Sequence, residues 1–461
     1  MSRTPRRTWS VASLFSTCAL AAVAVGCGGD EKSGSSGDAA KSSGPKSLNV
    51  AIVDNPQMKD IAKLTPELFT KKSGIKVNYT VLDEATLRQV TTRDVAAGGK
   101  QFDVTMIGMY EAPQFGQSGQ LTDLTKYATE DAAYKADDLI PTVKSGLSAD
   151  GKLYAAPFYA ESSFLMYRKD VLKKAGVTIP DKPTWDQVAA AAKKVDTEKM
   201  AGICLRGKPG WGDLGGAFNT VLNTYGGTWW EANEDGSPGK AQVDTPEFRQ
   251  ALTFYTDLVK DVGEKDAANS SFNECLSQYK DGKVAMWYDA TVAAGLLEAD
   301  DSDVKGKNGY AAAPVVKTKE AGWLWAWSLA IPTSNKNPDL AWKYLSFATG
   351  PEYIKAAGTK IDGGWAAIPP ATRKSTYEIP EYKKAAAAFA DKTLTSLETA
   401  PIDNPGTTKR PGLPGIQYVG IPEWQDVGNR CTELFSSVIA GRATVDEVIP
   451  KCQEIASSAV Q

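Results

Sequence analysis

The fold is decided by residues 47–107, which contain three short apolar segments, SLNVAIV (47–53), IKVNYTVL (75–82) and FDVTMI (102–107). Each segment is rich in β-branched and apolar residues and has the length of a buried strand. Between them, Thr65-Pro66-Glu67 predicts the start of one helix, because threonine is a favoured N-cap and proline suits the first helical position. Residues 85–97 predict a second helix. This βαβαβ order predicts a doubly wound α/β layer, whose ligands bind beyond the carboxyl ends of its strands.

Helices and strands continue to alternate along the rest of the chain. Capping-box spacing at Thr184–Gln187 predicts a helix start, and apolar residues at helical spacing predict a helix across 248–259. Further strands are predicted at 283–288 and 329–332, and further helices after Asn337-Pro338 and after Thr444.

The length of the chain indicates more than one lobe. At 461 residues it exceeds the size at which a single core keeps growing. We therefore expect an α/β protein with two lobes. The expected N-terminal lobe comprises residues 47–158 and about 309–360, and the expected C-terminal lobe comprises residues 159–308 and about 361–461.

The composition excludes several classes of function. The sequence has no histidine, which removes Ser-His-Asp and Cys-His nucleophiles and the HExxH zinc helix. It also predicts ligand binding that is nearly independent of pH from about 6 to 8. The 52 Lys and Arg residues do not exceed the 55 Asp and Glu residues, so no nucleic-acid partner is indicated. The composition does not exclude enzymes whose catalytic groups are carboxylates.

The first 26 residues are predicted to be a signal peptide. Arg3, Arg6 and Arg7 precede an uncharged apolar stretch that is too short to span a membrane. The stretch ends in Ala24-Val25-Gly26-Cys27, which resembles a bacterial lipobox, so Cys27 is the expected lipidation site. A plain secretory signal with an incidental cysteine is the alternative, and both Sec and twin-arginine export stay open. Residues 28–46 are rich in glycine, serine and lysine and predict a flexible tether.

Four cysteines follow Cys27. An even number of cysteines in an exported chain suggests two disulfides, and four cysteines allow three pairings. We favour Cys204 with Cys275, and Cys431 with Cys452, the second of which ties together the C-terminal helices. None of them has the CxxC spacing of a metal or redox site, so we expect no metal and no cofactor.

Several blocks resemble one family of transport proteins. They are FDVTMI (102–107) with GQLTDL (119–124), KLYAAPFY (152–159) with YRKD (167–170), and GKVAMW (282–287). In order and spacing they resemble the extracytoplasmic solute-binding proteins of carbohydrate ABC importers, in the family that includes maltodextrin-binding proteins. Four more segments resemble the branch that binds polyols such as mannitol and sorbitol, namely PFYAESS (157–163), GWG (210–212), GWLWAWS (322–328) and QYVGIPEW (417–424). This branch usually has glycine where Ala160 stands.

The resemblance implies a function without catalysis. Two lobes, joined by a hinge near Pro157–Ala160, would close on a polyol or sugar and deliver it to an ABC permease. The protein would be a monomeric lipoprotein on the outer face of the bacterial cell membrane, attached only by its N-terminal lipid. Two other functions stay open, a secreted glycoside hydrolase with paired carboxylates such as Glu161 and Asp289, and an adhesin-type lipoprotein that binds no small molecule.

A polyol site needs polar groups for hydroxyls and aromatic rings for C–H surfaces. The candidate ligand-binding residues are Tyr110, Glu161, Ser162, Arg206, Trp211, Asp289, Trp325, Trp327 and Trp365. The resemblance implies that Glu161 and Asp289 contact the ligand. Both residues also lie at the ends of predicted strands, which is where α/β sheets bind their ligands.

Most of the candidates have a structural alternative. The alternative role of Glu161 is that of one partner in a structural ion pair. The alternative role of Asp289 is that of the N-cap of a helix over residues 290–297. Ser162 is otherwise a turn cap. The tryptophans at 325 and 327, which alternation places on one face of a strand, are otherwise core residues. Arg206 and Trp211, which flank a loop rich in glycine, are otherwise anchors of that loop.

Overall fold

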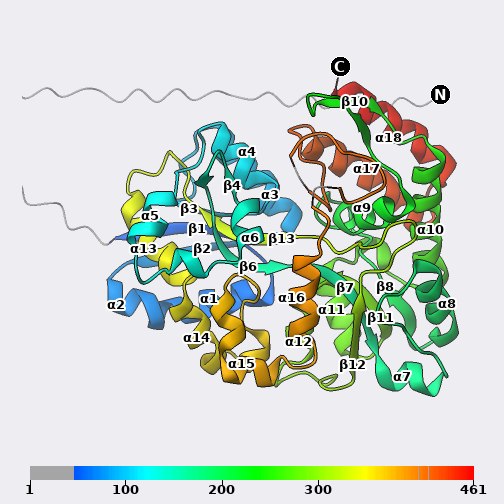
Figure 1. The fold of residues 1–461 in the computed structure, drawn as a ribbon, viewed down its shortest axis with the longest axis horizontal. Coiled ribbons are helices and arrows are strands. Elements are labelled where there is room, and N and C mark those ends of the chain that lie inside the picture. The colour runs from blue at the N-terminus through cyan, green and yellow to red at the C-terminus, as the bar shows by residue number, and fades with distance from the viewer. Residues whose placement is uncertain (1–45, 403, 414, 461) are drawn as a thin grey trace, which may run out of the picture. The chain divides into compact units, whose positions relative to one another are not determined.

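The three strands predicted between residues 47 and 107 lie in one five-stranded sheet of the computed structural model (Figure 1). The structure describes residues 46–402, 404–413 and 415–460. The predicted signal peptide, Cys27 and the tether up to residue 45 lie outside the described residues.

The first sheet has the strand order β2-β1-β3-β13-β6. β1 (Ser47–Val53) is parallel to β2 (Lys76–Leu82) and to β3 (Val104–Ile107). β13 (Trp325–Ala330) is antiparallel to β3 and to β6 (Ala156–Glu161). The carboxyl ends of the parallel strands β1 and β2 are thus brought side by side, as the βαβαβ pattern predicts.

A second sheet has the order β12-β7-β11-β8. Its strands are β7 (Ser163–Arg168), β8 (Ala201–Cys204), β11 (Val284–Ala290) and β12 (Asn308–Ala312). Two small hairpins pair β4 (Ser148–Ala149) with β5 (Lys152–Leu153), and β9 (Trp230–Ala232) with β10 (Pro238–Ala241).

Helices pack around both sheets (Figure 1). In the first half of the chain they are α1 (Pro56–Thr65), α2 (Lys71–Ser73), α3 (Glu84–Ala96), α4 (Glu111–Gln117), α5 (Thr125–Glu130), α6 (Pro141–Gly146), α7 (Lys169–Lys174), α8 (Trp185–Val195) and α9 (Leu214–Tyr225). In the second half they are α10 (Pro246–Val262), α11 (Phe272–Lys280), α12 (Val292–Leu297), α13 (Pro338–Ala348), α14 (Pro351–Lys360), α15 (Pro380–Ala385), α16 (Ala390–Glu398), α17 (Trp424–Ile439) and α18 (Val445–Ala459). Short 3₁₀ turns lie at Ala136–Asp138, Ala267–Asn269, Gly364–Ala367 and Lys374–Glu378.

The chain passes between the two sheets at identifiable points. Only Ser162 separates β6 of the first sheet from β7 of the second, and the chain returns between Ala312 and Trp325. The backbone of residues 370–372 bonds back to Ala160 and Ile140, whereas α16 packs on β12. We therefore propose that the lobes divide at Ser162, between β12 and β13, and before α16, rather than near residues 158, 309 and 361.

The first helix does not start where the sequence predicts. It begins at Pro56, where the Asn55 side chain accepts a hydrogen bond from the Met58 amide at 2.9 Å. Thr65 is inside the helix, with its hydroxyl donating to the Ile61 carbonyl at 2.7 Å, and a π-helical turn over Pro66–Thr70 continues to α2. The prediction of a start at Thr65-Pro66 is wrong because the wider turn accommodates a proline that has no N–H to donate.

Most other predicted elements are confirmed. α8 has the full capping box between Thr184 and Gln187, and α18 has one between Thr444 and Glu447. α10 buries the predicted apolar face, and α13 begins at Pro338. The strand predicted at 329–332 is β13, which begins four residues earlier, at Trp325.

Both favoured disulfides are present. Cys204 at the end of β8 is bonded to Cys275 in α11, and Cys431 in α17 is bonded to Cys452 in α18. Among the described residues, no helix has both the length and the apolar character needed to cross a bilayer.

Candidate functional site

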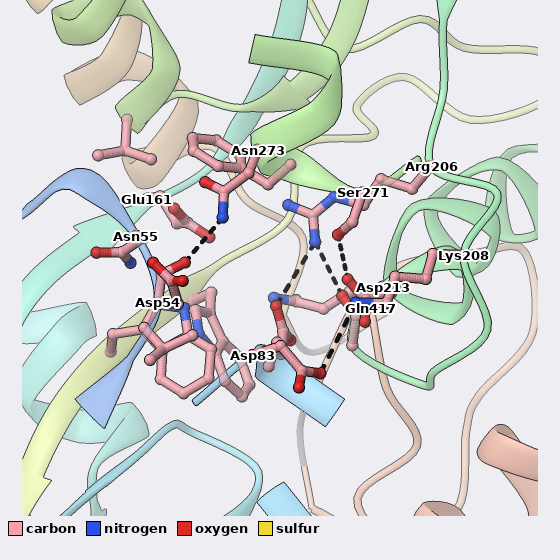
Figure 2. A pocket seen from close by; sticks show the side chains of 18 of the residues that line it. Asp54, Asn55, Asp83, Glu161, Arg206, Lys208, Asp213, Ser271, Asn273 and Gln417 are labelled. Carbon is pink, nitrogen blue, oxygen red and sulfur yellow. Dashed lines mark hydrogen bonds and ion pairs between the residues drawn. The ribbon is translucent and has the colours of Figure 1, made fainter. Parts of the chain in front are cut away.

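A cavity of about 180 Å³ lies between elements of the two sheets. Asp54 and Asn55, which follow β1, and Asp83 and Glu84, which follow β2, line one side of it. Arg206, which follows β8, lies on the opposite side (Figure 2). The carboxyl ends of parallel strands therefore provide much of the site, as the sequence predicts.

The register of the first sheet places four large side chains on one wall of the cavity. Trp325 is paired with Glu161 across β13 and β6, and Trp327 is paired with Tyr159. Because side chains alternate along a strand, these two cross-strand pairs face the same way, and all four residues line the cavity. The predicted placement of Trp325 and Trp327 on one face is confirmed.

Asp289 is an anchor for Arg206. The guanidinium donates to both carboxylate oxygens of Asp289, at 2.8 and 2.6 Å, and to the Gly212 carbonyl at 3.0 Å. Burial opposes the charge of Arg206, yet the ion pair with Asp289 prevails and raises the pKa of Arg206 well above its usual value. Asp289 is fully buried and does not line the cavity. It does not cap the next helix either, because Thr291 is the N-cap residue of α12.

Arg88 is a second buried arginine that the sequence reasoning missed. It donates to Glu84 at 2.8 Å and to Glu111 at 2.5 Å. Its guanidinium lies over the rings of Trp211, Trp327 and Trp325, at 4.0, 4.6 and 4.8 Å from their centroids. Three of the predicted tryptophans thus line the cavity and also enclose this cation.

Glu161 is the predicted residue that best fits a ligand contact. Its side chain is nearly buried, and its carboxylate has no hydrogen-bond or ion-pair partner among the described residues. Burial raises its pKa well above the usual value, and the nearby Arg206 only partly offsets that effect. An acceptor held in this way is available to a ligand hydroxyl.

Other polar atoms of the cavity wall also lack partners. The indole N–H groups of Trp211 and Trp323 and the side-chain carbonyl of Gln417 are buried and have no hydrogen-bond partner in the part of the chain that the structure describes. Buried polar atoms are rarely left unpaired in proteins. Two donors and one acceptor are therefore available in addition to Glu161. Of these three residues, only Trp211 is among the ligand contacts predicted from the sequence.

Asp213 is a further residue of the wall that the sequence reasoning missed. It accepts a hydrogen bond from the Ser271 hydroxyl (Figure 2). Burial, reinforced by the negative charge of Glu84, raises the pKa of Asp213 to about 7. It follows a Gly-Trp-Gly loop, and nothing in that local pattern distinguishes it from a solvated loop acid.

Besides Asp289, three other predicted residues do not line this cavity. Tyr110 donates its hydroxyl to the carbonyls of Ile421 and Pro422, at 3.0 and 3.2 Å, and its ring packs on Trp211. Ser162 is fully buried at the crossing between the sheets, where its backbone bonds to Thr291. Trp365 packs on α14 in a separate surface groove.

Known proteins of one family are similar to this chain. Residues 53–355 match the model of the family described as bacterial extracellular solute-binding protein. The chain is 38% identical over 415 residues to a mannitol-binding protein of Pseudomonas aeruginosa, with 89% of this chain and 92% of that protein covered.

Solved structures have the same fold. An ABC transporter solute-binding protein of Agrobacterium vitis with bound D-mannitol superimposes with a TM-score of 0.84 at 42% identity, covering 90% of this chain and 98% of that one. One from Agrobacterium radiobacter in complex with ribitol gives a TM-score of 0.78 at 25% identity, with the same coverage of both chains. The fold is thus the two-lobe α/β fold of such proteins, which are not enzymes. This chain belongs to the bacterial extracellular solute-binding proteins.

Proposed function

We propose that this protein captures a small neutral polyol between its two lobes and delivers it to the permease of an ABC transporter. The observation that carries the proposal is the nearly buried carboxylate of Glu161, which has no described partner and lies on a cavity wall beside Trp325 and Trp327. The relatives named for mannitol and ribitol support this class of ligand.

The size of the cavity favours a single small molecule. Its volume of about 180 Å³ is below the roughly 300–1,000 Å³ that is typical of pockets for larger ligands. An acyclic polyol presents hydroxyl groups along its whole length. The wall offers acceptors at Glu161 and Gln417 and donors at the indoles of Trp211 and Trp323.

Calorimetric titration of the mature domain tests the proposal. The panel contains mannitol, sorbitol, arabitol, ribitol, and common mono- and disaccharides, and at least one polyol is expected to bind with micromolar affinity or better. Glu161→Ala should weaken that binding by about 1–3 kcal/mol, because it removes a buried hydrogen-bond acceptor. Glu352→Ala is the matched control, because Glu352 is exposed and forms a surface ion pair with Lys72. Titrations without heat across the whole panel would exclude the proposed ligand class.

We further propose that Cys27 carries a lipid that holds the protein on the outer face of the membrane. The support is the lipobox-like segment Ala24–Cys27 and the Gly/Ser-rich sequence that follows it. Expression in a bacterial host with labelled palmitate should label the wild-type chain but not Cys27→Ser, which should be found in the soluble exported fraction. Labelling of the variant would refute the anchor and leave the binding function untouched.

A further inference from the structure

Five alternating charges form a continuous chain from one lobe to the other. They are Asp289 and Arg206 of the second lobe, followed by Glu84, Arg88 and Glu111 of the first, and we call them the interlobe ion-pair chain. The pairs inside each lobe are short, with N–O distances of 2.5 to 2.8 Å. The link between the lobes, from Arg206 to Glu84, is longer at 3.8 Å.

Glu84 is the point at which the two lobes meet in this chain. Its Oε1 atom accepts from Arg88 of its own helix, and its Oε2 atom faces Arg206 across the cavity. The side chain is only 17% exposed, so little solvent screens this contact. Without a carboxylate at position 84, the cations of Arg88 and Arg206 would approach each other with no anion between them.

The loop that carries Trp211 fits directly onto the same carboxylate. At Gly212 an added Cβ would lie 2.0 Å from Glu84 Oε1 and 2.9 Å from Arg88 Nε. The Gly212 carbonyl accepts a bond from Arg206, and the neighbouring Trp211 ring covers Arg88. The absence of a side chain at position 212 therefore lets the second lobe reach the Glu84–Arg88 pair.

We propose that Glu84 and Gly212 set the free energy of lobe closure and thereby the affinity for ligand. Glu84 acts as a positioning residue, and its negative charge draws Arg206 and the Gly212 loop onto the first lobe. This inference rests on the proposed function, because it takes closure to be the event that traps the polyol. Contacts that exist only in the closed form favour that form and so strengthen apparent binding.

Two variants test this role and separate it from an effect on stability alone. Glu84→Gln keeps the size of the side chain and removes its charge, and Gly212→Ala inserts a methyl group where the lobes meet. The matched controls are Glu67→Gln, which alters an exposed ion pair with Lys360, and Gly406→Ala, where the nearest atom to an added Cβ is at an ordinary 3.4 Å. D-mannitol is the probe, and small-angle X-ray scattering with and without it measures closure.

Both variants should raise the dissociation constant for D-mannitol about tenfold or more, a typical size for coupling between distant events. Both should also need correspondingly more ligand to reach the smaller radius of gyration, while ligand-free melting temperatures stay close to those of the controls. Wild-type affinity and wild-type scattering in both variants would overturn the inference, as would lowered melting temperatures with unchanged affinity. If the wild-type chain binds no polyol, the proposed function fails by itself. In that case, scattering without ligand tests the inference about Glu84 and Gly212. A larger radius of gyration in both variants than in wild type would support it. Identical scattering curves would overturn it.

Discussion

At the scale of single residues, the buried ionisable groups are divided between those that pair with one another and Glu161, which has no partner among the described residues. Arg206 is held by Asp289, and Arg88 is held by Glu84 and Glu111. Glu161 lies beside them without a described partner. A buried carboxyl group is costly unless it is paired, and its place on the cavity wall supports the ligand contact proposed above.

Arg206→Met should destabilise the fold strongly. The variant leaves Asp289, which is fully buried, without its cation, and removing one partner of a buried pair typically costs about 3–5 kcal/mol. Arg249→Met is the control, because Arg249 is one-third exposed and its pairs with Asp244 and Asp446 lie at the surface. There the expected loss is at most about 1 kcal/mol. Denaturant titration of both variants measures the difference, and equal losses would contradict it.

Asp213 should make stability depend on pH. Its pKa is about 7 in the folded chain and 3.8 for an unperturbed group, so between these values the folded chain holds a proton that the unfolded chain has released. Stability due to this group therefore falls as pH rises from about 4 to 7. Asp213→Asn should raise the melting temperature relative to wild type more at pH 8 than at pH 4. A difference between variant and wild type that does not change with pH would refute this assignment. A carboxyl group with this pKa titrates within the range, about 6 to 8, over which the absence of histidine predicts ligand binding nearly independent of pH.

Single-residue patterns predicted part of the site, for physical reasons. Glu161, Trp325 and Trp327 were identifiable because an acid in an apolar run and rings at a two-residue spacing are unusual in a strand. Arg88 was not identifiable, because Glu84 and Arg88 have the four-residue spacing of an ordinary solvated helix pair. Only the fold brings Trp211 and Glu111 to that helix.

At the scale of elements, capping signals in the sequence predict a helix start correctly where no helix is already under way. The capping boxes of α8 and α18 place both helix starts correctly, because the cap bonds involve only neighbouring residues. Thr65-Pro66 carries a similar signal but follows a helix that has already been started by Asn55. Burial of Met58, Ile61 and Leu64 against the core keeps that helix continuous through the proline.

The two disulfides should contribute unequally to stability. Cys204–Cys275 closes a loop of 71 residues, and Cys431–Cys452 closes one of 21. If the crosslinks act mainly by restricting the unfolded chain, their removal should cost about 4.4 and about 3.3 kcal/mol respectively. Paired Cys→Ser variants of each, compared by denaturant unfolding, give this order. The opposite order would show that local packing, rather than loop length, determines the contributions.

At the scale of the whole molecule, sequence alone predicted two α/β lobes but not how their faces meet. The lobe boundaries depend on which strand pairs with which, and that pairing spans more than a hundred residues in the case of β13 with β6. The cavity is made where elements of both sheets approach. The charged groups on its wall therefore come from both lobes.

The cavity should discriminate a neutral polyol from its acid. Carboxylates outnumber cations on its wall, and each cation there, Arg88, Arg206 and Lys208, already has a carboxylate within 4 Å. An anionic ligand would have to displace one of these carboxylates and approach Glu161.

D-mannonate, which differs from D-mannitol by one carboxylate in place of a CH₂OH group, should therefore bind at least about a hundredfold more weakly, because like-charge contacts cost several kcal/mol. Thermal unfolding measures this directly, since a ligand at a hundred times its dissociation constant stabilises the folded state by about 2.7 kcal/mol. Equal shifts from both compounds would mean that Arg88 or Arg206 leaves its partner to bind the anion, and the charge pairing in the cavity would then not define the ligand class.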